Sequence, residues 1–127
     1  AVGLGRLWGQ AVRVERLLAD AAAPKEALWA ALRTFEGFTV LVHPNGALAT
    51  AVNLGGFRNS AMVFTAPDCV AAMEPQAPGT TRAHLRGREL FELLPRAGVD
   101  SVVFNPLGPG TRAVLPLSVV ASVLQLA

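Results

Sequence analysis

The clearest structural signal in this sequence is the stretch Ser101-Val102-Val103-Phe104-Asn105-Pro106-Leu107-Gly108-Pro109-Gly110. A short apolar run bounded by turn-forming residues is typical of a strand that is buried on both faces of a sheet. Asn105 precedes a proline, which favours an extended backbone, and its side chain can cap neighbouring backbone groups. Gly108 and Gly110 permit positive φ values and the close approach of another chain. We therefore expect a strand over Ser101–Phe104, followed by a loop that is either a rigid turn or a binding loop.

The residues before this stretch carry the pattern of three more strands. Thr39–His43 is rich in β-forming residues and ends in Pro44-Asn45-Gly46, a strong hairpin turn because Asn and Gly tolerate positive φ values. Ala47–Asn53 is then the returning strand. Gly55-Gly56 opens a loop that runs to residue 60. Ala61–Thr65 is apolar throughout and is expected at the centre of the sheet.

Apolar residues at helical spacing predict two N-terminal helices. The first spans Leu4–Asp20, and the second begins at Pro24 and ends at Gly37. The other predicted elements are a helix over Cys69–Glu74, a strand over Thr81–Arg86, a helix over Arg88–Arg96, a strand over Thr111–Leu115 and a helix over Leu117–Leu126. This order predicts one α+β domain over 1–127, with a helical segment over 1–36 and a core over 37–127. The core would hold a mixed sheet of five to six strands, with helices mainly on one face.

The composition indicates an ordered domain with some apolar surface left for a partner. Hydrophobic residues make up 52% of the 127 residues, and the net charge of +2 is too small to indicate nucleic acid as a partner. Cys69 is the only cysteine, so the chain forms no internal disulfide and the expected location is the reducing cytoplasm. No signal peptide is visible, and the longest apolar stretch, Leu115–Ala127, falls short of the ~20 residues that span a bilayer.

Three segments carry motifs of one protein family. Met62–Asp68 has a Phe-Thr pair at the end of a strand and before a short helix, and Gly87–Leu94 has the opening of a helix. Val102–Pro106 is an apolar strand that ends in an Asn-Pro loop followed by glycines. In these motifs and their order, the chain from Phe38 onward resembles the SseB-like (enhanced serine sensitivity) domain family of bacteria. The resemblance implies a bacterial α/β domain and supplies no catalytic residues.

Two loops hold the candidate binding residues. These residues are Asn105, Gly108, Gly110, Thr111 and Arg112 in one loop, and Phe57 and Arg58 in the other. For the first loop, the favoured interpretation is a rigid turn between two strands, and a binding loop is the alternative. For the second, the alternative is that Phe57 folds back onto the core. A phosphate-binding P-loop is excluded because the Lys-Ser/Thr pair is missing and a strand follows instead of a helix.

Arg82, His84, Arg86 and Arg88 form the one basic stripe of the sequence. Residues two apart share a face of a strand, so three of these side chains could line up. Nucleic-acid binding would also need exposed aromatic residues or more basic ones, and neither is evident. The favoured interpretation is a solvated sheet edge whose charges protect it from aggregation.

No set of residues in the sequence points to catalysis or to a metal. His43, His84 and Cys69 show no ligand spacing, and the serines lack a Gly-x-Ser-x-Gly elbow. Cys69 at a helix N-terminus could have a lowered pKa and act as a nucleophile, but a buried thiol is the commoner role. We therefore expect no catalytic residue, metal site or cofactor.

The expected function is a non-catalytic protein-interaction or regulatory module of the bacterial cytoplasm. It would bind a protein partner or a second copy of itself, as a homodimer, through the two loops and the helices that carry Trp8 and Trp29. Nucleic acid and membranes are not expected partners. The alternative is a small-molecule binding protein for an anionic metabolite, with Asn105, backbone amides near Gly110 and Arg112 as contacts. An enzyme that uses Cys69 is a third hypothesis.

Overall fold

Five helices and six strands make up the described part of the chain, residues 2–107 and 111–125 of a computed structural model. The helices are α1 (Val2–Ala19), α2 (Lys25–Thr34), α3 (Pro67–Met73), α4 (Gly87–Leu93) and α5 (Val120–Leu124). The strands are β1 (Phe38–Val42), β2 (Thr50–Leu54), β3 (Phe57–Phe64), β4 (Thr81–Leu85), β5 (Ser101–Phe104) and β6 (Ala113–Pro116). The predicted α+β class with a mixed sheet is confirmed.

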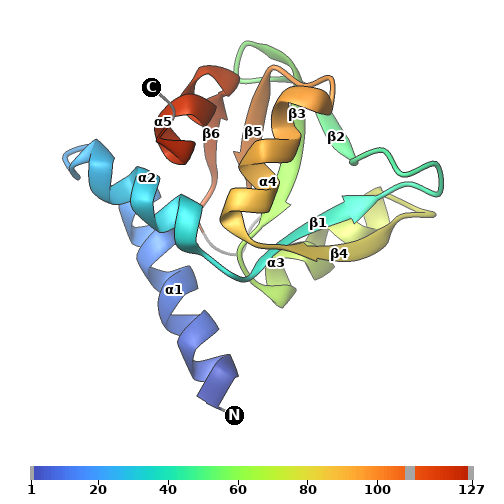
Figure 1. The fold of residues 1–127 in the computed structure, drawn as a ribbon. Coiled ribbons are helices and arrows are strands. Elements are labelled where there is room, and N and C mark those ends of the chain that lie inside the picture. Colours follow the sequence, from blue (N-terminus) through green and yellow to red (C-terminus); the bar gives the residue numbers. More distant parts are fainter. Residues whose placement is uncertain (1, 108–110, 126–127) are drawn as a thin grey trace.

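The strands form one mixed sheet with β3 and β5 at its centre (Figure 1). The strand order is β4-β1-β3-β5-β6, and β2 also pairs with β3. β3 and β5 run parallel, with Met62 opposite Val103, whereas every other pair within the described residues is antiparallel. The residues of β5 and the second half of β3 are all buried, as their apolar sequences predict.

The chain after the Asn45-Gly46 turn does not simply return along β1. The turn itself forms as predicted, with Gly46 at φ 90° and the His43 N–H donating to the Ala47 carbonyl at 2.9 Å. Beyond it, only one bridge joins residues 42 and 48, and from Thr50 onward the chain pairs with β3 instead. β1 pairs with the end of β3 only, so the first half of β3 has an open edge that β2 completes.

The predicted loop from Gly55 to residue 60 is wrong beyond its two glycines. Gly55 and Gly56 have φ values of 59° and 85° and form a two-residue hairpin turn, because positive φ at both positions matches the twist of the flanking strands. β3 therefore begins at Phe57, opposite Leu54. Phe57 and Arg58 are strand residues, and Phe57 is half-buried.

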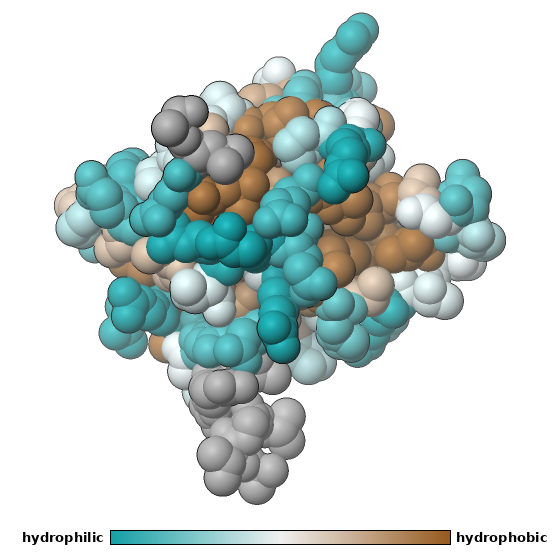
Figure 2. All heavy atoms as spheres, in the orientation of Figure 1, coloured by the Kyte–Doolittle hydropathy of each residue, from teal (hydrophilic) through white to brown (hydrophobic). Residues whose placement is uncertain are grey.

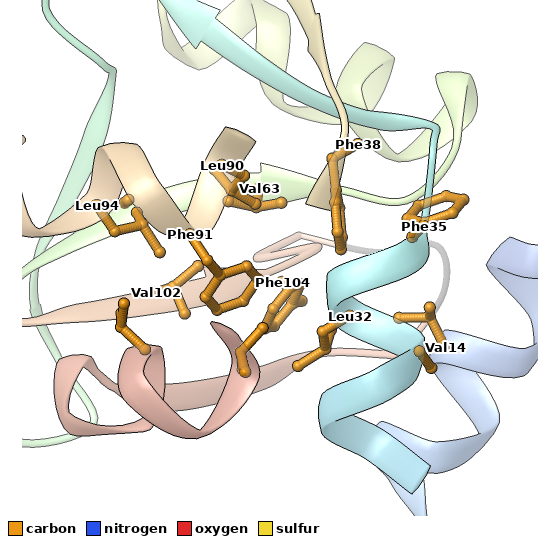
Figure 3. Packing of buried hydrophobic residues seen from close by; sticks show 14 of the residues in the cluster. Val14, Leu32, Phe35, Phe38, Val63, Leu90, Phe91, Leu94, Val102 and Phe104 are labelled. Atoms are coloured by element: carbon orange, nitrogen blue, oxygen red, sulfur yellow. The ribbon is translucent and has the colours of Figure 1, made fainter. Parts of the chain in front are cut away.

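Helices cover the two faces of the sheet unequally, as predicted (Figure 1). In the same orientation, Figure 2 shows hydrophobic residues at the surface between hydrophilic ones. α2, α4 and α5 pack together over one face and α1 packs on α2, whereas α3 lies on the other face. Alternate strand residues serve the two layers because successive side chains of a strand point to opposite faces. The larger core, shown in Figure 3, includes Val14, Leu32, Phe35, Phe38, Val63, Leu90, Phe91, Leu94, Val102 and Phe104. The smaller core under α3 comprises Leu41, Ala49, Met62, Phe64, Cys69, Val70, Met73 and Val103.

α2 and α4 approach each other closely enough to require glycine at one position. The Gly87 N–H donates to the Phe35 carbonyl at 2.7 Å. A Cβ atom at Gly87 would lie 1.8 Å from the Leu32 carbonyl oxygen. On its other side α2 is tied to α5, because the Arg33 guanidinium donates to the Val123 carbonyl at 3.0 Å. These contacts fix α2 and the chain that follows it into β1.

Several element ends differ from the predictions by a few residues. α3 begins at Pro67 and ends before Pro75, while α4 gives way to a 3₁₀ turn that contains Pro95. Proline lacks an N–H group and cannot continue the α-helical hydrogen bonds, which explains both ends. The last strand starts at Ala113, and the closing helix begins as a 3₁₀ turn over Leu117–Val119.

Candidate functional site

A hollow of about 470 Å³ lies between α1, the joint of α2 and β1, and the start of α3. Its lining residues are Trp8, Ala11, Phe35, Glu36, Gly37, Thr39, Thr65, Ala66, Pro67 and His84. Binding sites in proteins are typically concave, roughly 300–1,000 Å³ in volume, and mostly apolar with a few polar groups. The hollow has this size and this mixture of residues.

Trp8 forms an exposed wall of the hollow. Its side chain is 70% exposed, whereas Ala11 and Val14, one and two turns later in α1, are buried against the body of the domain. Residues three or four apart lie on the same side of a helix. The N-terminal end of α1 projects beyond the rest of the domain (Figure 1). The buried stripe of α1 therefore leaves the domain at Trp8, beside the hollow.

Thr39 and His84 supply the polar groups on the β1–β4 side of the hollow. The antiparallel register of β1 and β4 places the two residues directly opposite each other, on the sheet face that α3 covers. The Thr39 Oγ1 and the His84 Nδ1 are 3.2 Å apart and hydrogen-bonded. The His84 Nε2 has no hydrogen-bond partner among the described residues, so this atom can meet a bound group.

Asn105, the first candidate residue of the sequence, lies fully buried inside the domain. Its Oδ1 accepts the Thr65 N–H at 3.1 Å, and its Nδ2 donates to the Thr65 Oγ1 at 3.1 Å and to the Thr111 carbonyl at 3.0 Å. Its φ of 50° lies in the left-handed region, so the extended backbone expected before Pro106 is wrong. The hydrogen bonds offset this strained conformation. Asn105 thus joins the ends of β3 and β5 to the chain that enters β6.

None of the described residues of this loop lines the hollow. Gly108 and Gly110 lie outside the described residues. The Thr111 N–H donates to the Glu15 carboxylate at 2.6 Å, which ties the loop to α1. The Arg112 side chain is exposed and does not line the hollow. The structure therefore brings Asn105 and Thr111 together as parts of the framework beside α1.

Phe57 and Arg58 lie at the opposite end of β3, where Asp100 holds the backbone. The Asp100 carboxylate accepts the N–H groups of Arg58 at 2.9 Å and of Asn59 at 3.2 Å. The Arg58 N–H in particular lowers the pKa of Asp100 below its usual range. This role of Asp100 was not predicted from the sequence, where its only signal is an acidic residue directly before a buried strand. The Arg58 side chain itself is exposed.

Cys69 is a buried thiol at the start of α3. Burial raises its pKa, and the negative charges of Asp68 and Glu15 raise it further. The alternative in which its pKa is lowered is therefore wrong, because desolvation and two carboxylates outweigh the helix N-terminus. A protonated thiol is a poor nucleophile, and Cys69 packs in the smaller core like a small apolar residue.

The basic stripe lies on the edge strand β4 and after it. Arg82 donates to both carboxylate oxygens of Glu74, at 2.8 Å and 2.7 Å, so its guanidinium is already paired. This hydrogen bonding lowers the pKa of Glu74 and raises that of Arg82. His84 is bonded to Thr39 as described. This arrangement matches a solvated sheet edge.

Comparisons with known proteins leave the family unassigned. No protein-family model matches the chain, and no curated protein shows significant similarity to it. In residues 2–107 and 111–125, no group of three His, Cys, Asp or Glu side chains is placed to hold a metal ion. Within the same residues, no helix has both the length and the apolar composition needed to cross a membrane.

The hollow itself could not be found from the sequence. Its residues come from four separate segments, around positions 8–11, 35–39, 65–67 and 84. Each segment reads locally as an ordinary element or element end. The only local signal was Trp8, a large aromatic residue on the same helical stripe as Ala11 and Val14.

Proposed function

We propose that this chain is a non-catalytic interaction module that binds a protein chain, either a partner or a second copy, in the hollow beside Trp8. The observation that carries the proposal is the 70% exposed indole of Trp8 at the edge of an apolar hollow of about 470 Å³. Tryptophan is among the residues that contribute most of the binding energy at protein interfaces, where it sits in a desolvated pocket. A partner that covers Trp8 removes this apolar surface from water.

The proposal moves the binding surface from the two loops to the hollow. The Asn105 amide is occupied by bonds within the domain, and Phe57 and Arg58 lie at the far end of β3. We retain the SseB-like family and a location in the bacterial cytoplasm as parts of the proposal. Their support is the order of the three motifs around Phe64-Thr65, Gly87–Leu94 and Phe104-Asn105-Pro106, together with the single buried cysteine.

A small-molecule binding protein is the second candidate, and the Thr39–His84 pair is the observation that favours it. A ligand in the hollow would contact the Trp8 indole and hydrogen-bond to the His84 Nε2. Such a ligand would be mainly apolar, because Arg112 does not line the hollow and the Asn105 amide is engaged elsewhere. A thermal-shift screen that compares aromatic compounds with phosphates tests it, since a ligand of the folded state raises Tm.

The hollow can be tested as a binding surface with the fluorescent probe 1-anilinonaphthalene-8-sulfonate. At a low chain concentration, where no second copy fills the hollow, we expect saturable binding of the probe to the native chain and its loss in Trp8→Ala. The matched control is Val52→Ala, because Val52 is 68% exposed but lies on β2, away from the hollow. Equal probe binding by both variants and the parent chain would show that the hollow is not the binding surface.

A further inference from the structure

We infer that the occupant of the hollow is Trp8 of a second copy, so that two chains pair about a two-fold axis and each inserts its indole into the other. This inference rests on the proposed function and names the partner for the same site. It makes the interface reciprocal: every chain is both donor and acceptor of a tryptophan.

α1 already packs inside its own chain through one stripe of its surface, and this stripe continues to Trp8. Ala11 and Val14 are 5% and 1% exposed because α1 packs on α2 and the larger core. One turn before Ala11, Trp8 lies on the same stripe but is exposed. The packing surface thus extends past the end of the domain, and a second helix or hollow is needed to cover it. Burying an aromatic side chain of this size is strongly favourable.

The Trp8 anchor and the hollow that would accept it lie next to each other on one chain. A two-fold interface uses the same patch from both subunits, so the patch must be complementary to itself. Trp8 lines the edge of the hollow while its ring stays largely in solvent, so it leaves room in the hollow. When a second copy approaches in the opposite orientation, each indole faces the hollow of the other chain.

Charge complementarity between α1 and the edge of the hollow favours the same pair. α1 exposes Arg13 and Arg16, whereas its Glu15 carboxylate is already bonded to the Thr111 N–H. The exposed Asp68 follows Pro67 at the edge of the hollow. An α1 helix laid across the hollow of a second chain brings basic side chains towards this carboxylate. Added salt should therefore weaken the pair.

The first experiment measures mass and the environment of Trp8 in the full chain. Light scattering after size exclusion should show twice the 13.3 kDa of one chain at high concentration. In a Trp29→Phe variant, Trp8 is the only tryptophan, and its emission should shift to the blue over the same concentration range. Trp8→Ala should weaken the pair about a thousandfold, because the dimer loses two indoles and each is an interface residue worth about 2 kcal/mol. Val52→Ala should leave the pair unchanged.

A second variant blocks the hollow without removing the indole. Ala66 is half-buried, lines the hollow and has an extended backbone, so Ala66→Leu adds side-chain volume there at little conformational cost. Ala66→Leu alone should weaken the pair as Trp8→Ala does. Mixed in equal amounts, the two variants should form a mixed dimer. In it, Trp8 of the Ala66→Leu chain enters the unblocked hollow of the Trp8→Ala chain, a contact that neither homodimer can make. Native mass spectrometry should show this mixed dimer in excess over either homodimer.

The outcomes separate this inference from the proposed function. If the parent chain stays monomeric and the Trp8→Ala variant loses probe binding, the hollow remains a binding surface and the two-fold pair is overturned. A dimer that neither variant weakens, or mixed variants without excess mixed dimer, also overturns the reciprocal exchange. If the parent chain neither forms a dimer nor binds the probe, both proposals are overturned.

Discussion

Replacing Asn105 by alanine should cost about 4 kcal/mol of unfolding free energy. The side chain makes three hydrogen bonds of 3.0–3.1 Å to Thr65 and Thr111, each worth about 1 kcal/mol net, and all lie inside the domain. Alanine at φ 50° adds about 1 kcal/mol, because its Cβ is crowded in the left-handed region. For a domain of this size the loss corresponds to roughly 10–20 °C in Tm.

Chemical unfolding followed by circular dichroism measures this loss, and Asn105→Gly divides it. Glycine also lacks the three hydrogen bonds but accepts a positive φ, so it should be about 1 kcal/mol less harmful than alanine. The nearby control is Arg112→Ala, whose exposed side chain should change the stability by less than about 0.5 kcal/mol.

The reasoning about Asn105 is refuted if Asn105→Ala costs less than about 1 kcal/mol, since the three hydrogen bonds alone exceed that value. It is refuted in part if alanine and glycine behave alike. In that case, the left-handed backbone at residue 105 carries no measurable strain.

Three further predictions concern other parts of the chain. Gly87→Ala should destabilise the domain by about 3 kcal/mol or more, because its Cβ would meet the Leu32 carbonyl at 1.8 Å. The control Gly9→Ala has nothing within 4 Å of its Cβ, so it should stabilise α1 by about 0.5–1 kcal/mol in the same unfolding assay. The lowered pKa of Asp100 means that its carboxylate stabilises the fold above the usual value of 3.8 and that this contribution is lost as the pH falls through the lower folded-state pKa. The stability gap between the parent chain and Asp100→Asn should therefore be constant from neutral to mildly acidic pH and shrink below 3.8; a gap that grows there would contradict it. Cys69 should react with a thiol reagent far more slowly in the native chain than in denaturant, and a faster native reaction would restore the nucleophile hypothesis.

Local patterns predicted the elements whose formation depends on a few neighbouring residues. The apolar run Ser101–Phe104 became a buried central strand, and Asn45-Gly46 formed the expected turn. The failures came where a partner strand was decisive. Phe57 to residue 60 has no clear alternation, yet it is a strand because β2 and the N–H acceptor Asp100 lie beside it.

The candidate site shows the same division. The sequence marked Asn105 by its neighbours, but a residue type does not reveal whether its side chain faces inward or outward. Inside the fold, its amide is saturated by Thr65 and Thr111, which come from other parts of the chain. In the same way, the helix position of Cys69 was correct, but its raised pKa depends on burial and on Glu15, more than fifty residues away in the sequence.

By itself, the sequence determined that this protein is a single α+β domain, because hydrophobic periodicity and turn residues act over short distances along the chain. The tertiary structure alone decided where the candidate binding hollow lies. The hollow exists because α1, the α2–β1 joint and α3 leave space where they meet, and Trp8 stands exposed beside it. Such a space depends on how distant segments pack, and no local pattern of residues encodes it.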